Sequence, residues 1–353
     1  MDAKAPRNCD ETRRPTRHLT DGTRRASRRA VVEAICRVST ETRWPPAAGG
    51  PIGAALHLPA TASEAGVDFG RSAAAEVVKR TSGFANSRPG GKYVAKNSSA
   101  AGGMAFPMKT LPDLRPVRGE CLTVTGRTIA ENPEYVGRND EQDVIRPADM
   151  PIVSTGGVIG VEGNLASEGA VDKVAGMKNL KFTGAVVGFD REEDCSEAAI
   201  ERRRAKDVVF MIGDEGLRRS AGRHERPATA AAHTTTADWG HGVGRKVATV
   251  TNGRVSGATP GGGIGHVGPE AAVGEPVALR RDSDIIDIDA IDGTLNARVC
   301  DTEFTRRRAE WAPWPGEFRS RAVWIIAQGV GSARTGAVAH PGARGEISSY
   351  AEI

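Results

Sequence analysis

The stretch of sequence that decides the fold runs from residue 251 to residue 278 and reads TNGRVSGATPGGGIGHVGPEAAVGEPVA. It directly follows a β-rich run, VATV, at 247–250. A serine flanked by glycines, a run of glycines, a histidine and a Glu-Ala-Ala turn follow one another here. A strand that ends in a glycine turn lets the backbone approach a ligand closely. The stretch therefore predicts a ligand-binding turn after a strand, with a plain Gly-rich loop between two strands as the alternative.

Further segments carry short motifs whose order is more specific than any one of them. They read CLTVTG at 121–126, GNLASEGAV at 163–171, KNLKFTG at 178–184, DSDIIDID at 282–289 and GAV at 336–338. Together with TNGRVSG and GHVGPEA, they resemble in sequence and order the segments T-D-G-R-F-S-G, G-N-L-A-P-E-G-A-V, G-H-V-x-P-E-A and D-G-D-x-I-x-I-D of the dihydroxy-acid dehydratases. The wider superfamily contains sugar-acid dehydratases. The resemblance extends from about Arg29 to about Val338.

The order of expected elements predicts an α/β chain with a compact β-barrel-like domain and flanking helices. Helices are expected at 28–38, at 52–65, where Pro59 would produce a kink, at 193–204, and at 301–311 with Asp301 as the N-cap. A short strand is expected at 121–125. The other β-like runs stand at 158–161, 186–189, 208–212, 247–250, 277–279, 285–288 and 295–299.

Three parts are expected along the chain. Residues 1–28 form a basic disordered leader, and residues 29–135 and 136–345 form two further units. The boundary falls where Asn, Asp, Glu and Pro dominate the sequence. The resemblance implies that residues 29–135 are a remnant, the helical tail of an incomplete α/β N-terminal domain. It also implies that residues 136–345 are the family's C-terminal, swivelling β-barrel-like domain.

Charge and composition limit the classes of function. The chain has 353 residues and a net charge of +4, and the basic surplus lies in the first 30 residues. No aromatic residue is interleaved with those arginines, so a solvated leader is favoured over a nucleic-acid-binding segment or a transit peptide. No run of 18 apolar residues and no apolar secretory region is found. We therefore expect a cytoplasmic protein with neither nucleic-acid nor membrane partners.

Five cysteines are spread along the chain: Cys9, Cys36, Cys121, Cys195 and Cys300. Their odd number, and the lack of a secretory signal, argue against a disulfide framework. Their spacing, which contains no C-x-x-C pair, argues against a metal cluster built from neighbouring ligands. We expect each of them to be a small buried or half-exposed side chain.

The resemblance assigns the chemistry to two residues. Ser256 stands where the family has the proposed general base that removes the proton next to the substrate carboxylate. A serine needs a metal ion or a positive field nearby to act in this way; from spacing alone it would be a turn serine. Glu225 stands where the family has a glutamate that binds Mg²⁺, in a segment that opens at Glu215. Its intervening residues differ from the family's E-G-P-x-G-G-P-G-M-x-E, so a solvated loop glutamate is the alternative.

Four neighbouring residues are candidates for binding the substrate or supporting the site: Gly253, Arg254, Gly257 and His266. The glycines would let backbone N–H groups face the substrate. A lone histidine is more often a hydrogen-bonded core residue than a ligand, so His266 is expected to have a supporting role. Two departures from the family lie beside Ser256: Asn252 replaces Asp and Val255 replaces Phe.

The resemblance implies a hydro-lyase that acts on a small 2,3-dihydroxy-3-methyl acid and yields a 2-keto acid for valine and isoleucine synthesis. It also implies an iron–sulfur cluster, Mg²⁺ and a homodimer. The chain contains neither the C-D-K nor the G-A-C-G-G motif that would supply cluster and further metal ligands, so no cluster ligands are expected in it. We therefore expect a truncated chain that is weakly active or inactive alone. A gluconate- or xylonate-type dehydratase and a non-catalytic remnant or subunit are the alternatives.

Overall fold

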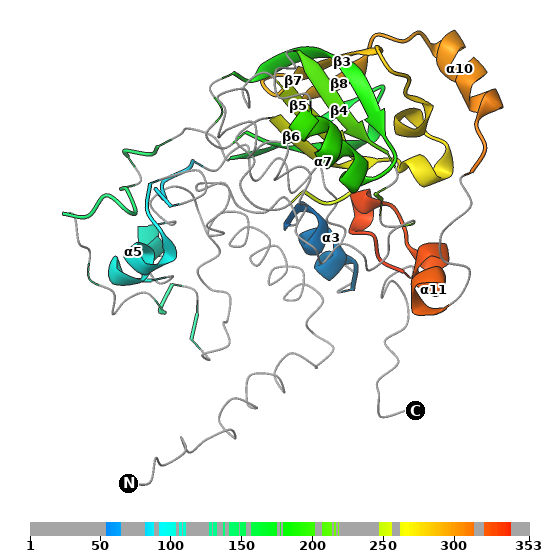
Figure 1. The fold of residues 1–353 in the computed structure, drawn as a ribbon. Helices are drawn as coiled ribbons and strands as arrows, with labels where there is room; N and C mark the ends of the chain where they lie inside the picture. Colours follow the sequence, from blue (N-terminus) through cyan, green and yellow to red (C-terminus); the bar gives the residue numbers. More distant parts are fainter. Residues whose placement is uncertain are drawn as a thin grey trace, which may run out of the picture.

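The computed structural model describes the protein in segments (Figure 1), and the structural statements below concern these segments only. They comprise residues 54–64, 82–87, 92–103, 106–107, 109–110, 127–128, 130–132, 137, 141–147, 149–152, 157–174, 177, 179–201, 207–213, 215–216, 218, 247–255, 262–313 and 321–339. The basic leader, the helix expected at 28–38 and the strand expected at 121–125 lie outside them.

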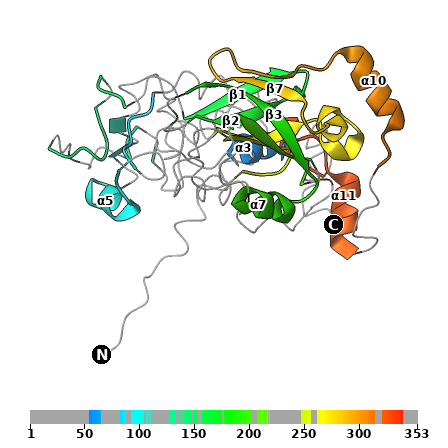
Figure 2. The same ribbon diagram turned by 45° about the horizontal axis from the view of Figure 1, so that its top comes forward.

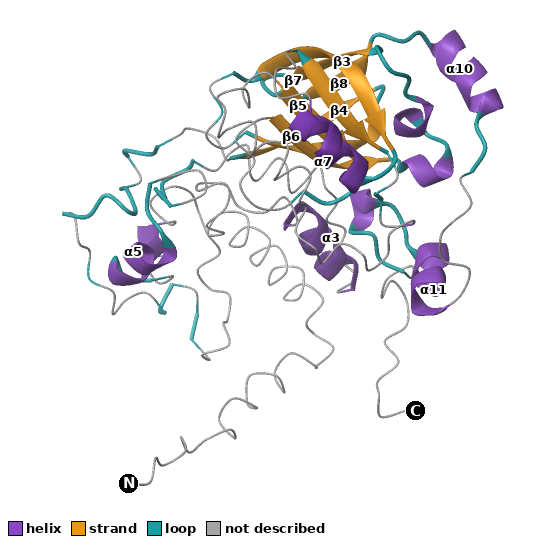
Figure 3. Cartoon of the chain, viewed as in Figure 1, coloured by secondary structure: helices purple, strands orange, loops and turns teal. Residues whose placement is uncertain are grey.

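Eight strands close into a barrel, and the expectation of a β-barrel-like domain is confirmed. The order around the barrel is β1-β2-β6-β5-β4-β3-β7-β8. Their bounds are Val158–Gly163 (β1), Ala166–Lys173 (β2), Lys181–Phe189 (β3), Val208–Ile212 (β4), Val247–Thr251 (β5), Gly262–Gly268 (β6), Ile285–Asp289 (β7) and Thr294–Ala297 (β8). The barrel is drawn as the group of arrows in Figure 3.

Four neighbouring strands of the barrel, β3, β4, β5 and β6, run parallel to one another. In register, Phe189 pairs with Ile212 and Ile212 pairs with Thr251. The central strands β4 and β5 read VVFMI and VATVT. Runs of this kind, apolar or β-branched at nearly every position, are typical of parallel strands that are covered on both faces. Parallel pairing brings the carboxyl ends of all four strands to the same end of the barrel.

Two apolar layers cover the two faces of these strands. Alternate side chains fill the interior, among them Met211, Val250 and Ile264, all fully buried. The outer face of β4 and β5 packs under helix α7 (Glu192–Glu201), with Cys195 and Phe210 in contact. Figures 1 and 2 show α7 lying across this outer face. This two-sided burial explains why β4 and β5 consist of apolar and β-branched residues and contain no charged ones.

The remaining helices of the described segments differ in how close they lie to the barrel. Helix α3 (Ala54–Glu64) contains Pro59 and contacts the short 3₁₀ helix η6 (Ala333–Thr335) below the barrel in Figure 1. Helix α10 (Asp301–Glu310) follows β8, and α11 (Arg321–Gly329) follows α10. Helix α5 (Ala95–Ala100) lies apart from the barrel in Figures 1 and 2. Within the described residues, no helix has the length and apolarity that crossing a membrane would require.

Several expectations for single elements were wrong. The run at 277–279 is part of a 3₁₀ helix, η5 (Pro276–Leu279), because Pro276 at its start lacks the N–H that a strand ladder uses. The N-cap of α10 is Cys300, and Asp301 is the first residue of the helix. Cys300 is exposed, whereas Cys195 is buried as expected. Strands β2 and β6 were missed because glycines and charged residues conceal their β pattern.

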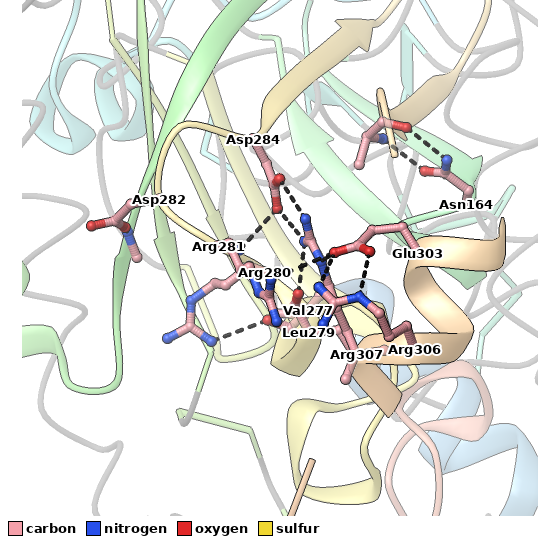
Figure 4. Close-up of polar contacts among 12 residues, drawn as sticks. Asn164, Val277, Leu279, Arg280, Arg281, Asp282, Asp284, Glu303, Arg306 and Arg307 are labelled. Carbon is pink, nitrogen blue, oxygen red and sulfur yellow. Dashed lines mark hydrogen bonds and ion pairs between the residues drawn. The ribbon is translucent and has the colours of Figure 1, made fainter. Parts of the chain in front are cut away.

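A charged network fastens α10 to the barrel (Figure 4). The guanidinium of Arg307 donates to both carboxylate oxygens of Asp284, at 2.6 and 2.9 Å, and to the carbonyl oxygen of Leu279 at 3.0 Å. It also donates to Glu303 at 2.8 Å. The side chains of Arg307 and Asp284 are only 9% and 14% exposed. A bidentate ion pair that is shielded from water in this way fixes the orientation of both side chains.

We predict that Arg307→Ala lowers the free energy of unfolding by about 3–5 kcal/mol, because it leaves the partly buried Asp284 carboxylate without its partner. The matched control is Arg298→Ala, whose ion pair with Asp287 is exposed to water, so its loss should lower stability far less. Urea unfolding at neutral pH measures both. Equal losses in the two variants would contradict the prediction.

A buried carboxyl group, that of Asp172, lies inside the barrel. Asp172 is 1% exposed, and it pairs in register with Ile159 on β1 and Ile264 on β6, so it shares the interior side with them. Its Oδ1 has no hydrogen-bond partner in the described part of the structure. Burial raises the pKa of Asp172 from 3.8 to about 7, although the backbone N–H of Lys173 acts in the opposite direction. The fold therefore favours the protonated form.

Because this pKa is raised by folding, stability should fall as pH rises from about 4 to about 7 and stay low above that range. We predict that Asp172→Val is more stable than the natural protein at pH 8, by several kcal/mol, and that the difference is much smaller at pH 4. Asp287→Asn is the control, since Arg298 and Thr183 lower the pKa of Asp287 and give the opposite trend. Urea unfolding across this pH range measures both variants. A gain in the free energy of unfolding from Asp172→Val that does not change with pH would contradict the prediction.

Candidate active site at the carboxyl ends of the parallel strands

The loops that leave the parallel strands start at one end of the barrel. Residues 213–218 follow β4, residues 252–255 follow β5, and Glu270 comes soon after β6. Ligand sites of α/β proteins are commonly found at the carboxyl ends of parallel strands. This end of the barrel is therefore the place to look for a site, and it contains the stretch that opened the sequence analysis.

The starts of the loops after β4 and β5 touch each other. The side-chain amide of Asn252 donates to the carbonyl oxygen of Gly213, although the two residues are 39 positions apart in sequence. Asn252 is 1% exposed. The N–H of Gly253 donates to Thr251 Oγ1 at 3.0 Å, which tightens the turn at the end of β5. Strand pairing and this amide contact together fix the two loops relative to each other.

His266, on β6, forms a hydrogen bond with the same turn through its backbone. Its backbone N–H donates to the carbonyl oxygen of Gly253 at 2.9 Å, and the residue is 1% exposed. Its φ of 54° lies in the left-handed region, which residues other than glycine rarely occupy. Such strain persists only where the surrounding structure enforces it, often at functional sites. His266 thus acts on the Gly253 turn through its backbone.

Glu215, at the start of the loop after β4, connects this loop to helix α7 through its side chain. Its Oε1 accepts a hydrogen bond from the backbone N–H of Glu192, the first residue of α7, at 3.1 Å. A carboxylate at a helix N-terminus also interacts favourably with the helix dipole. The carbonyl oxygen of Glu215 lies so close to Gly253 that a Cβ there would be 2.8 Å from it. Glu215 therefore joins α7, β4 and the turn after β5.

Arg280 crosses the ends of β3 and β4. Its guanidinium donates to Phe189 O at 2.6 Å, to Asp190 Oδ1 at 2.8 Å and to Val277 O at 3.0 Å. It also packs on Gly213, where a Cβ would be 2.2 Å from Nη1, so only glycine fits there. Arg280 was not singled out in the sequence, because two of its three partners, the Phe189 carbonyl and the Asp190 carboxylate, are distant in sequence.

The structure describes only some of the candidate residues. Gly253 is buried in the turn after β5, and the next residue, Arg254, is partly buried. The Nε of Arg254 is shielded from water and has no hydrogen-bond partner in the described segments. His266 is buried beneath the turn. Ser256, Gly257 and Glu225 lie outside the described residues. Their positions in the sequence put Ser256 five residues after the end of β5 and Glu225 in the segment that follows β4.

The described residues do not form a site for an iron–sulfur cluster. Cys195 is on α7 with its side chain buried against β4 and β5, whereas Cys300 is the exposed N-cap of α10, so the two thiols belong to separate parts of the fold. No group of three or more His, Cys, Asp or Glu side chains in the described segments is arranged to hold a metal ion. Glu215 and Glu270 lie at the carboxyl ends of the parallel strands, where a site is expected. Each of the two carboxylates accepts a hydrogen bond from a backbone N–H there.

Comparisons with known proteins identify the family. Residues 143–337 match the family described as "Dihydroxy-acid/6-phosphogluconate dehydratase C-terminal", and residues 25–132 match its N-terminal counterpart. The chain belongs to this dehydratase family. The resemblance that the motifs suggested is thereby confirmed, over nearly the extent expected.

Named relatives agree with this assignment. Dihydroxy-acid dehydratase 2 of Mesorhizobium japonicum is 51% identical over 307 residues, which cover 87% of this chain and 52% of the relative. Dihydroxy-acid dehydratase 2 of Bradyrhizobium diazoefficiens is 50% identical, with 87% and 53% covered. The dihydroxy-acid dehydratase of Parvibaculum lavamentivorans is 46% identical, with the same coverage. The chain spans about half the length of the curated relatives it matches.

The two departures beside Ser256 have structural consequences. Val255 is buried and lies against Gly265, where a Cβ would be 2.8 Å from Val255 Cγ2. Asn252 uses its amide N–H to reach the Gly213 carbonyl, and its Oδ1 has no partner in the described segments. An ionised aspartate, which the family has here, could not donate this hydrogen bond.

We predict that Asn252→Asp destabilises the protein by about 1–3 kcal/mol at pH 8, because a buried carboxylate would face a carbonyl oxygen. Burial should raise the pKa of the new carboxyl, so the loss should shrink at pH 5, where the protonated group can donate. The control is Asn296→Asp: the Oδ1 of Asn296 accepts from Asn164 N at 2.9 Å, which a carboxylate can also do. Thermal unfolding at both pH values tests this, and an equal loss at the two would refute it.

Proposed function

We propose that the chain is a hydro-lyase of the dihydroxy-acid dehydratase type, which converts a 2,3-dihydroxy-3-methyl acid into a 2-keto acid. One observation carries the proposal: the family's motif residues after β4, β5 and β6 meet at one end of the barrel. Asn252 contacts Gly213, and Gly253 contacts both Glu215 and His266. These contacts support a shared site for the two loops that bear the candidate chemistry.

In the proposed reaction, Ser256 accepts the proton from the carbon next to the substrate carboxylate. The hydroxyl group leaves the neighbouring carbon and takes up a proton, so that one water molecule is released, and the resulting enol tautomerises to the 2-keto acid. A base held in place contributes typically about 10²–10⁴-fold to the rate. Gly253 and Gly257 would present backbone N–H groups to the substrate, Arg254 would offer its guanidinium to the carboxylate, and His266 would hold the Gly253 turn.

Mg²⁺ and an iron–sulfur cluster are the cofactors that the resemblance implies, with Glu225 proposed as a Mg²⁺ ligand. Because the described residues contain no set that fits the cluster, no step is assigned to it. We retain the expectation that the chain alone is weakly active or inactive, and that it forms a homodimer in the cytoplasm. The domain limits of 29–135 and 136–345, and the swivelling character of the barrel, are part of the same proposal.

The test is an assay of 2-keto acid formation by the purified chain after reconstitution with iron, sulfide and Mg²⁺. We expect slow turnover of a 2,3-dihydroxy-3-methyl acid that Ser256→Ala lowers by about 100-fold or more. Ser332→Ala is the control: it removes a serine hydroxyl at the N-cap of η6, outside the proposed catalytic residues. Fast turnover would contradict the expected low activity of the chain, and residual turnover that Ser256→Ala leaves unchanged would exclude this base.

Substrate choice separates the alternatives. Preference for gluconate or xylonate in the same assay would favour the sugar-acid dehydratases. If no substrate is turned over, calorimetric titration with the dihydroxy acid decides between a catalytic site and a non-catalytic subunit. Absence of binding at millimolar acid would refute the proposed substrate.

A further inference from the structure

The loop that leaves β4 is tied to the residue that follows β6, although β5 lies between these two strands. The backbone N–H of Arg218 donates to Oε2 of Glu270 at 2.9 Å. Glu270 is 4% exposed and is the N-cap of the 3₁₀ helix η4 (Ala271–Val273). The loop therefore passes over the carboxyl end of β5 and is held on the far side of it.

Gly216 makes this approach possible. A Cβ on Gly216 would be 2.3 Å from Glu270 Oε2 and 2.8 Å from its Cδ, so no side chain fits between the loop and the carboxylate. We call the arrangement of Glu270, Gly216 and Arg218 the Glu270 contact. A hydrogen bond to a carboxylate is among the stronger ones in proteins, and more so when shielded from water.

The turn that leads to Ser256 lies directly beneath the tied loop. Gly253 is pressed against Glu215, whose carbonyl oxygen would be 2.8 Å and whose Cβ would be 3.0 Å from a Cβ on Gly253. From the other side, Gly253 O accepts the N–H of His266, which is on β6 itself. The turn after β5 is thus enclosed between the tied loop and β6, the strand that leads to Glu270.

We propose that Glu270 is a positioning residue of the site: its carboxylate sets the height of the loop after β4 above the Gly253 turn, and so aligns the two segments that lead to Glu225 and Ser256. This role rests on the dehydratase function proposed above, because only there do the two segments share a substrate. Glu270 does not touch the reacting atoms. It acts through Gly216 and Arg218 on one side and through β6 on the other.

The first experiment compares Glu270→Leu with Glu270→Gln in the full chain. Leucine is similar in size but cannot accept the Arg218 N–H, whereas glutamine can. We expect Glu270→Leu to speed hydrogen exchange of the Arg218 and Gly253 amides by about tenfold or more, and Glu270→Gln to restore most of the protection. Unchanged protection of both amides in Glu270→Leu would overturn the proposal, as would an equal loss in both variants.

A second variant approaches the same contact from the loop. Gly216→Ala should loosen the Arg218 amide in the natural background, because the new methyl group displaces the carboxylate. In the Glu270→Ala background the methyl group has room, so the same substitution should have little further effect. Additive effects of the two substitutions would mean that Gly216 and Glu270 act separately, which the proposal excludes.

Arg307→Ala is the control for general destabilisation, since it weakens the same barrel at α10. It should not single out the Arg218 and Gly253 amides. Titration with the 2,3-dihydroxy-3-methyl acid then tests the functional side: Glu270→Leu should weaken binding by about tenfold, and Glu270→Gln and Arg307→Ala by much less. If the natural chain does not bind the acid, the proposed function fails, while the exchange results still decide whether Glu270 sets the loop.

Discussion

The parallel pairing of β3, β4, β5 and β6 is the constraint on which the rest of the structure depends. It places the carboxyl ends of four strands at one end of the barrel, so residues distant in sequence, such as Gly213 and Asn252, come into hydrogen-bond contact. The pairing itself depends on apolar burial on both faces, inside the barrel and under α7. The candidate site lies in the loops that follow these strands, as binding and catalytic residues often do.

Buried charged groups around the barrel differ in how well they are paired. Arg280 and Arg307 are largely buried and donate to backbone carbonyls and to the carboxylates of Asp190 and Asp284, respectively; Figure 4 shows the Arg307–Asp284 pair. Asp172, inside the barrel, has one oxygen without a partner in the described segments, and burial makes its charge costly. Paired charges fix geometry around the candidate site, whereas the single carboxyl only lowers stability.

Departures from the family pattern fall on positions with demanding geometry. Ser283 stands where the family's D-G-D segment has glycine, and its φ is 71°, which costs a residue with a Cβ about 1–2 kcal/mol. Asn252 replaces an aspartate and donates a hydrogen bond that an ionised aspartate could not. The closed barrel is retained with both of these residues in place.

The sequence by itself determined the family, the barrel-like class, and the strands β4, β5 and β7, because apolar and β-branched runs bounded by turns are local signals. It could not reveal β6, whose glycines read as a loop, nor could it show η5 in place of the run expected at 277–279. Glu270 lay within a recognised motif, yet its contact with Gly216 and Arg218 depends on the strand order around the barrel. Only the tertiary structure decided which loops meet, because contacts across the barrel arise from strand pairing between distant segments, and no local pattern encodes that pairing.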